Sequence, residues 1–199
     1  MGIVERKQRQ KEEVRGSILR AAWALVLAEG WQALSIRKIA DAIEYSVPVI
    51  YNHFENKEAI LQEFTKEGFG FLNEQLETAK QQHASPAKQL EAMAYAYWNF
   101  AVTNKEYYQL MYGLGMPTCE IVRQTPEMTK FSNLLQETIK ALIATSKNPE
   151  TDCFLKFHTY WSMLHGLISI NLTGRSAAPD KLNQLVLQDA IQGFIRNLE

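Results

Sequence analysis

The sequence predicts an all-α protein of about nine helices, and three observations support this fold class. Every long segment spaces its apolar residues three and four positions apart, and none alternates apolar and polar residues over the length of a strand. Proline follows Ser, Thr or Asn at several positions where such a helical pattern begins. A short helix, a break and a second short helix are expected between residues 34 and 57. We therefore expect an N-terminal three-helix domain over residues 1–57 and a second helical domain over residues 58–199.

Composition narrows the class of protein. Of the 199 residues, 46% are hydrophobic, which is enough to bury a core. No apolar run approaches the roughly 18 residues that a membrane span requires, and no signal peptide is recognisable. Cys119 and Cys153 share no spacing typical of metal or redox sites, so we expect free thiols and neither metal nor cofactor. These features favour a cytoplasmic protein without membrane contact.

Local capping signals define the individual elements. Gly30 is a residue type typical of the position that follows a helix, and Ser35 and Asn56 are good N-caps for the helices that follow them. Pro48 lies where the first turn of a helix tolerates proline. We expect helices over residues 14–29, 35–43, 47–54, 56–76, 85–103, 104–117, 125–142, 149–174 and 180–198.

The stretch from Leu34 to Lys57 has the spacing of a helix-turn-helix. Ile50 and Phe54 take the inward positions of its second helix, which is too short to be stable without packing. The residues left on the outer or flanking faces are Ser46, Val47, Val49, Tyr51, Asn52 and His53. A DNA major groove is the natural partner for such a face.

Charge is distributed in a way that agrees with this partner. The net charge is −1, but the extreme N-terminus carries Arg6, Lys7, Arg9 and Lys11 against Glu5 alone. Such an asymmetry can orient a DNA-binding head, although a frayed soluble tail would give the same pattern.

These residues resemble the DNA-binding domain of TetR-type repressors. The resemblance is carried by Leu34, Arg37, Ile39, Ala40, Pro48, Tyr51, His53, Phe54, Asn56 and Lys57. Further along, Trp161-x-x-x-His165-Gly166 is similar to a feature of one C-terminal subclass of that family, as is the Tyr97–Tyr112 stretch. One position departs from the pattern, because Glu44 stands where the turn usually has Gly. A left-handed backbone there costs a residue other than Gly about 1–2 kcal/mol.

The resemblance implies a role for each matching residue. Tyr51, His53 and Lys57 would contact phosphates, with Ser35 and the basic N-terminal arm adding to them. Arg37 and Asn52 would meet base edges, and Val47 and Val49 could touch thymine methyl groups. The predicted DNA-contacting set is Ser35, Arg37, Ser46, Val47, Val49, Tyr51, Asn52, His53 and Lys57.

The last two helices predict a homodimer. The helix over residues 149–172 is apolar nearly all round and carries a row of small residues that includes Ser162, Gly166 and Ser169. The last helix also has two apolar faces. Two such helices suit a four-helix bundle built with the same pair of a second copy. A monomeric core is the alternative.

An excess of aromatic residues predicts a pocket for a small apolar or aromatic effector. The candidate lining residues are Phe71, Tyr95, Trp98, Tyr112, Phe131, Phe157 and Trp161, with His165, Asn99 or Asn171 as polar anchors. A well-packed core would explain each of them individually. In the effector interpretation, ligand binding shifts the helix that starts near Asn56 and changes the spacing of the two recognition helices.

We therefore predict a sequence-specific transcriptional regulator that a small molecule releases from its operator. One rival hypothesis is an enzyme that uses Cys153 with His158 or His165, but these lie on one apolar helix without an acidic partner at useful spacing. The other rival is a helix-turn-helix protein without an effector, acting as an architectural or recruiting factor.

Overall fold

The computed structural model describes residues 2–113, 125–173 and 181–199, and within these ranges it contains nine α-helices, one 3-10 helix and no strand. The all-α prediction is confirmed. The elements are α1 (Ile3–Glu29), η1 (Trp31–Ala33), α2 (Ile36–Ala42), α3 (Val47–Tyr51), α4 (Lys57–Gln81), α5 (Pro86–Thr103), α6 (Lys105–Met111), α8 (Pro126–Ala144), α9 (Cys153–Thr173) and α10 (Lys181–Leu198).

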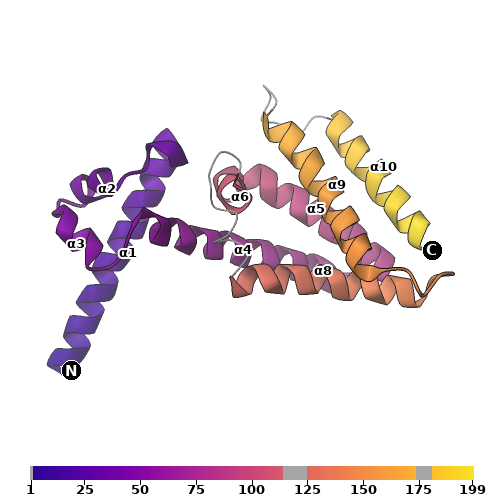
Figure 1. Cartoon of the computed structure of the whole chain (residues 1–199), viewed down its shortest axis with the longest axis horizontal. Helices are drawn as coiled ribbons and strands as arrows, with labels where there is room; N and C mark the ends of the chain where they lie inside the picture. Colours follow the sequence, from indigo (N-terminus) through magenta and orange to yellow (C-terminus); the bar gives the residue numbers. More distant parts are fainter. Residues whose placement is uncertain (1, 114–124, 174–180) are drawn as a thin grey trace.

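The N-terminal part consists of α1, α2 and α3 and lies at one end of the molecule (Figure 1). Ile18, Ala22 and Val26 form the buried stripe of α1, on which α2 packs, and α3 packs on α2. The side chain of Ser35 accepts a hydrogen bond from the backbone N–H of Lys38 and so caps α2 as predicted.

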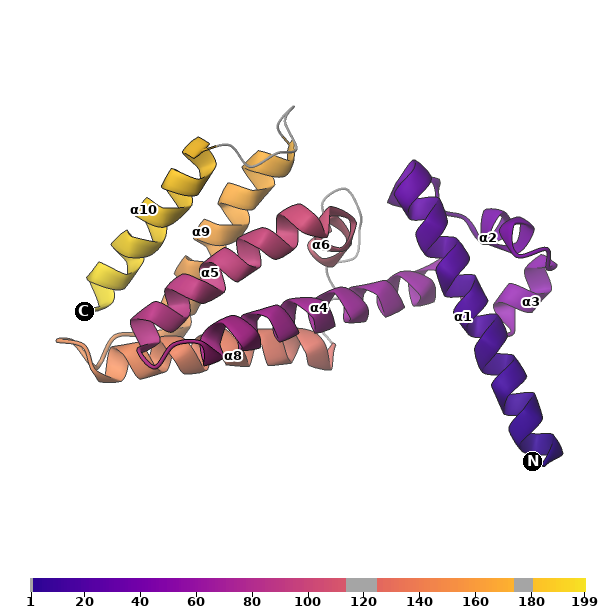
Figure 2. The same cartoon turned by 180° about the vertical axis from the view of Figure 1, so that it is seen from behind.

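The long helix α4 connects this part to the C-terminal bundle (Figure 2). Its N-cap is Asn56, whose side chain accepts from the backbone N–H of Ala59. Along its length α4 packs against α5, α6 and α8. Helix α9 lies between α8, α5 and α10, so α9 and α10 form the outer layer of the bundle.

Four predicted boundaries differ clearly from the structure. Helix α4 ends at Gln81 rather than at residue 76. Helix α9 begins at Cys153 rather than after Asn148, because the carboxylate of Asp152 accepts from two backbone N–H groups of its first turn. Helix α3 ends at Tyr51 rather than at residue 54, and α1 starts at Ile3, well before the predicted apolar stripe. Cys119 and the predicted helix start near residue 180 lie outside the described residues.

Among the described helices, none is both long and apolar enough to cross a membrane.

Candidate nucleic-acid interface and aromatic cluster

The short helix α3 is held from one side only. Ile50 and Phe54 are buried at 0% and 4% exposure, against Ile39 and Ala40 of α2 and the stripe of α1. The guanidinium carbon of Arg15 lies 4.8 Å from the centroid of the Phe54 ring, which adds a cation–π contact from α1. Arg15 also forms an ion pair of 3.0 Å with Glu63 of α4. All contacts that fix α3 therefore come from behind it.

The opposite side of α3 and the neighbouring surface of α2 carry most of the predicted DNA-contacting residues. Arg37, Ser46, Tyr51 and Asn52 are exposed, and the side chain of Tyr51 is 52% exposed although it is aromatic. The predicted residues that are half-buried around this face are Ser35, Val47, Val49, His53 and Lys57. The structure thus brings the predicted set together at one end of the N-terminal part.

The end of α3 carries a positive electrostatic environment. The pKa of His53 lies below its ordinary value because burial disfavours the imidazolium and because the charges of Lys11 and Arg15 repel it. Its Nδ1 atom is buried and has no hydrogen-bond partner within the described residues. The His53 imidazole can therefore take up a proton when a negatively charged partner offsets the charges of Lys11 and Arg15.

The turn between α2 and α3 contains a left-handed residue, and this backbone is costly because the residue is Glu rather than Gly. Glu44 has φ 58°, the one positive φ of a residue other than Gly in the described ranges. Its N–H bonds to the carbonyl of Asp41, and the next N–H, that of Tyr45, bonds to the carbonyl of Ala40. The hydrogen bonds of the turn therefore form despite the strain at Glu44.

A cluster of aromatic residues with polar tips lies inside the C-terminal bundle. The hydroxyl of Tyr97 is 3.3 Å from that of Tyr108 and accepts a hydrogen bond of 3.3 Å from Nε1 of Trp161. The Tyr108 hydroxyl lies 2.7 Å from Nδ1 of His165, and Nε2 of the same ring is 3.4 Å from the hydroxyl of Ser169. Burial lowers the pKa of His165 and keeps its ring neutral at pH 7.

One hydroxyl group of this cluster, that of Tyr112, makes no hydrogen bond of good geometry among the described residues. It is buried, and the polar atoms of Tyr97 and Trp161 lie close enough to influence its pKa. Burial raises this pKa, so the proton stays on the oxygen. Its ring lies 4.9 Å from that of His165 and 6.1 Å from that of Trp161. A buried hydroxyl without a partner costs about 1–3 kcal/mol, which a bound acceptor would recover.

Only half of the predicted effector residues meet in this cluster. Tyr112, Trp161 and His165 belong to it, and Phe131 joins through Tyr97, whose ring centroid is 5.9 Å away. Phe157 is buried beside His158 instead. The residues that the prediction missed are Tyr97, Tyr108 and Phe69, and the first two fall in the Tyr97–Tyr112 stretch, whose resemblance to the family was the signal that could have found them.

Three other predicted residues lie elsewhere. Phe71 is 40% exposed and meets the edge of Tyr107 on α6. Tyr95 and Trp98 line a separate pocket of about 370 Å³ between α5 and α10, which Asn99 and Lys181 also line. Asn171, the other proposed anchor, has a buried Oδ1 atom without a partner among the described residues.

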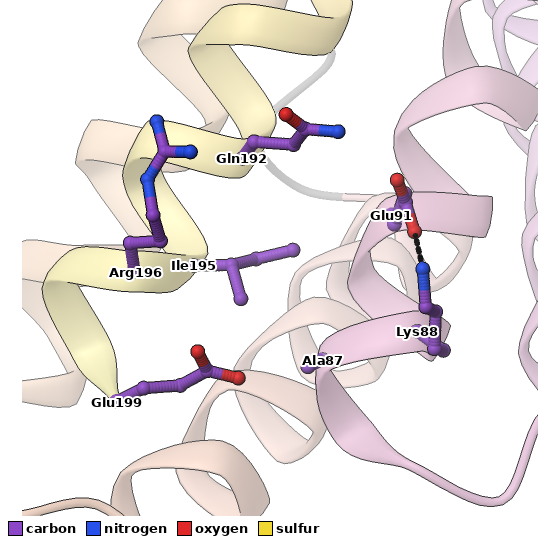
Figure 3. Close-up of a pocket in the computed structure, with 7 residues that line it drawn as sticks. All are labelled: Ala87, Lys88, Glu91, Gln192, Ile195, Arg196 and Glu199. Atoms are coloured by element: carbon purple, nitrogen blue, oxygen red, sulfur yellow. Dashed lines mark hydrogen bonds and ion pairs between the residues drawn. The ribbon is translucent and has the colours of Figure 1, made fainter.

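A further pocket of about 270 Å³ lies between the start of α5 and the end of α10 (Figure 3). Lys88 and Glu91 form an ion pair of 2.7 Å on its α5 side, and Ile195, Arg196 and Glu199 come from the C-terminal end of the chain. It contains no residue of the predicted effector set, and its charges are mixed.

Helix α6 connects the aromatic cluster to the N-terminal part. Tyr108 and Tyr112 meet each other and His165 in the aromatic cluster, whereas Tyr107 stacks on Trp23 of α1 with ring centroids 4.3 Å apart. The indole N–H of Trp31 donates to the carbonyl of Glu106 at 2.7 Å. A displacement of α6 therefore acts directly on the helix that supports α3.

The outer surfaces of α9 and α10 expose several large apolar side chains. The large apolar side chains exposed there are Phe154, Leu155, Ile170, Leu182, Leu185 and Val186, and each is at least 42% exposed. Gly166 and Gly193 face open space on these helices, because a Cβ atom added at either position would meet no atom within 4 Å. A second surface could therefore approach both helices closely.

The cysteine of the enzyme hypothesis has no activating environment. The thiol of Cys153 donates to the carbonyl of Gln136 at 3.5 Å, and burial raises its pKa. A thiol held in the protonated form is a weak nucleophile. The ring of His158 packs against the rings of Phe154, Phe157 and Trp161.

The helix-turn-helix with its free outer face and the helical bundle behind it define the class of DNA-binding transcription regulators. Two family models match the chain: the bacterial regulatory proteins of the tetR family over residues 18–64, and the tetracyclin repressor-like C-terminal domain over residues 90–190. The chain belongs to the TetR family. The comparison with curated proteins gives no match.

Solved structures share the fold over nearly the whole chain. FadR, the fatty acid degradation regulator from Bacillus halodurans, is 18% identical with a TM-score of 0.70, covering 91% of this chain and 94% of that one. The TetR family regulator PfmR from Thermus thermophilus is 22% identical with a TM-score of 0.65, covering 92% and 98%. FadR from Bacillus subtilis in complex with stearoyl-CoA is 18% identical with a TM-score of 0.69, covering 89% and 97%.

Proposed function

We propose that this chain is a sequence-specific DNA-binding repressor that binds its operator as a homodimer and is released by a small apolar or aromatic molecule. The observation that carries the proposal is the one-sided packing of α3, whose outer face exposes Tyr51 and Asn52 beside the exposed Arg37 of α2. Residues 1–57 would bind DNA, and residues 58–199 would bind the effector and the second copy.

The proposed division of roles on the DNA follows the position of each side chain. Tyr51, His53 and Lys57 lie around the ends of α3 and α4, where a hydroxyl, an imidazole and an ammonium group suit phosphate oxygens. Arg37 and Asn52 are exposed beside them and carry the groups that read guanine and adenine. The Ser35 hydroxyl oxygen already accepts a hydrogen bond from the backbone N–H of Lys38 as the cap of α2. Its O–H can still donate to a phosphate, so Ser35 would make a supplementary phosphate contact.

The outer surfaces of α9 and α10 would hold the second copy. The exposed apolar side chains and the two open glycines lie on the same two helices, which suits a four-helix interface with close helix approach. A dimer places two recognition helices about one DNA turn apart, so each protomer needs few base contacts.

We centre the effector site on the aromatic cluster around Tyr112, Trp161 and His165. The buried hydroxyl of Tyr112 makes no hydrogen bond of good geometry among the described residues, and α6 joins the cluster to α1. The stearoyl-CoA found in FadR from Bacillus subtilis supports an acyl chain or another apolar molecule as the ligand. Only a ligand that binds one arrangement of α6 more tightly than the other can release the DNA.

The test has two stages. Duplexes enriched from a random pool by the purified protein provide the operator, and acyl-CoA esters and aromatic compounds are then screened for release of that duplex. Trp161→Ala and His165→Ala should keep operator binding and lose release, whereas Tyr95→Ala, in the separate pocket, should keep both. Failure to enrich any duplex would refute the proposal, and an operator complex that no compound releases would favour a factor without an effector.

A further inference from the structure

The pocket between α5 and α10 is separate from the aromatic cluster and has no part in the proposed release of DNA. Its volume of about 370 Å³ lies at the lower end of the range typical of small-molecule sites. Tyr95 and Trp98 line it from α5, and Lys181, Gln184 and Gln188 line it from α10. A molecule bound here would therefore contact both helices at once.

The α10 side of this pocket carries a positive charge. Lys181, Gln184 and Gln188 are three and four residues apart and lie on one face of the helix. Within the described residues, Lys181 has neither an ion pair nor a hydrogen bond. None of the described residues that line the pocket is acidic. The ammonium group of Lys181 therefore lacks a counter-ion at this site.

Trp98 supplies a hydrogen-bond donor from the α5 side. Its side chain is 3% exposed, and its indole N–H makes no hydrogen bond within the part of the chain that the structure describes. The nitrogen is not among the fully enclosed polar atoms, so the small exposed surface of Trp98 leaves the N–H open to the pocket that the ring lines. Trp31 and Trp161, in contrast, donate to protein acceptors. An indole N–H can only donate, so its partner must be an acceptor.

The remaining lining is apolar. Leu187 is 1% exposed and lines the pocket together with the ring of Trp98, and Tyr95 is half-buried beside them. Leu185, which also lines the pocket, is 53% exposed and belongs to the apolar surface proposed for the dimer. Aromatic and aliphatic walls of this kind favour a ring as the body of the ligand.

We propose that this pocket is a second ligand site, which binds an aromatic carboxylate. The ring of the ligand packs on Trp98 and Leu187, and its carboxylate accepts hydrogen bonds from Lys181 and from the indole N–H of Trp98. Lys181 is exposed and carries its ammonium group on a flexible stem, so it can follow the carboxylate. A protonated amine would be repelled by Lys181, and a hydrocarbon would leave both donors without an acceptor.

The probes are naphthoate and naphthalenemethanol, which share the same ring and differ in charge. The chain contains four tryptophans, and in isotope-labelled full-length protein each indole N–H gives its own NMR signal. The signal that disappears in Trp98→Phe is that of Trp98. It should shift on titration with naphthoate, with a dissociation constant on the order of 1 mM or tighter, while the signals of Trp31 and Trp161 stay in place.

Matched variants test the charge. Lys181→Gln should weaken naphthoate binding about 3- to 10-fold and leave naphthalenemethanol binding unchanged, because only the carboxylate uses the ammonium group. Arg196→Gln removes the same charge from the same helix, about 22 Å further along, and should bind naphthoate like the wild type. Circular dichroism checks that both variants stay folded.

Three results would overturn the proposal. The first is a Trp98 signal that does not move at about 10 mM naphthoate. The second is an equal affinity for the two probes in the wild type, or an equal loss in Lys181→Gln and Arg196→Gln. The third is a shift of the Trp161 signal without one of Trp98, which would place naphthoate in the aromatic cluster. None of these measurements uses DNA, so a protein that fails to bind an operator would refute the proposed function and leave this test unaffected.

Discussion

Gly68 lies on α4 where α6 packs against it, and alanine at this position perturbs the contact without changing any polar group. A Cβ atom at Gly68 would lie 2.7 Å from Sδ of Met111 and 3.1 Å from Cδ1 of Tyr107. Met111 is 1% exposed, and the Tyr107 ring is held by its stack on Trp23 and by a hydrogen bond of 2.8 Å to Glu67. Relieving these contacts therefore requires the buried Met111 side chain to repack or α6 to move.

The expected magnitude follows from two opposing contributions. Overpacking of this kind typically costs about 1–3 kcal/mol, and replacing Gly by Ala inside a helix returns about 1 kcal/mol. We expect Gly68→Ala to lower the free energy of unfolding by about 1 kcal/mol. Gly70 is the control, because the same helix leaves open space around it, so Gly70→Ala should raise the free energy of unfolding by about 0.5–1 kcal/mol.

Urea denaturation followed by circular dichroism, at one protein concentration for all variants, measures both effects. Operator affinity measured on the folded proteins should change in Gly68→Ala, since the Trp31–Glu106 hydrogen bond must follow α6, and should stay at the wild-type value in Gly70→Ala. Equal stabilisation by the two alanines would show that α6 does not pack tightly on α4 and would refute the proposed route of coupling.

Three further predictions address the DNA contacts, the dimer and the aromatic cluster. Lys57→Ala and Tyr51→Phe should weaken binding to all duplexes about equally and flatten the salt dependence, and a changed sequence preference at constant salt slope would contradict their phosphate roles. Gly166→Leu should separate or distort the dimer in sedimentation experiments, and an intact dimer with normal DNA binding would place the interface elsewhere. Because burial lowers the pKa of His165 in the folded state, the unfolded chain takes up a proton first, near pH 6.5, as the pH falls. The wild-type melting temperature should therefore drop more between about pH 7.5 and pH 5.5 than that of His165→Gln, and equal drops would exclude this cause.

The helices of the N-terminal part could be predicted from the sequence because capping and turn preferences depend only on neighbouring residues. Ser35 and Asn56 cap the helices that follow them, and Glu44 takes the left-handed backbone that the spacing of the turn requires. The start of α9 was misplaced because Asn148 and Asp152 both offer capping side chains, and only the second accepts from the first turn. The free end of α1 was missed because an exposed, polar segment has no apolar periodicity to detect.

The members of the aromatic cluster were predicted only in part because helix periodicity cannot decide between two faces of a helix that are both covered. Tyr95 and Tyr97 are two residues apart on α5 and so point to different sides of the helix, one toward the pocket beside α10 and one into the cluster with Tyr108. Both sides of α5 are covered, so both residues had the same sequence signal. Which aromatic residues meet is decided by the packing of α6 and α9, which depends on the whole bundle.

The central claim, that the outer face of α3 reads DNA sequence, is tested most directly by a specificity ratio. Fluorescence anisotropy at one fixed salt concentration compares the enriched duplex with a scrambled duplex for the wild type, Asn52→Ala and the control Gln32→Ala, whose exposed side chain lies on η1. The wild type and Gln32→Ala should prefer the enriched duplex by about 10³-fold or more. Asn52→Ala should lose about 10- to 100-fold of that preference while it binds the scrambled duplex as before. A wild-type protein that binds both duplexes alike, or an Asn52→Ala variant that keeps the full preference, would contradict the account.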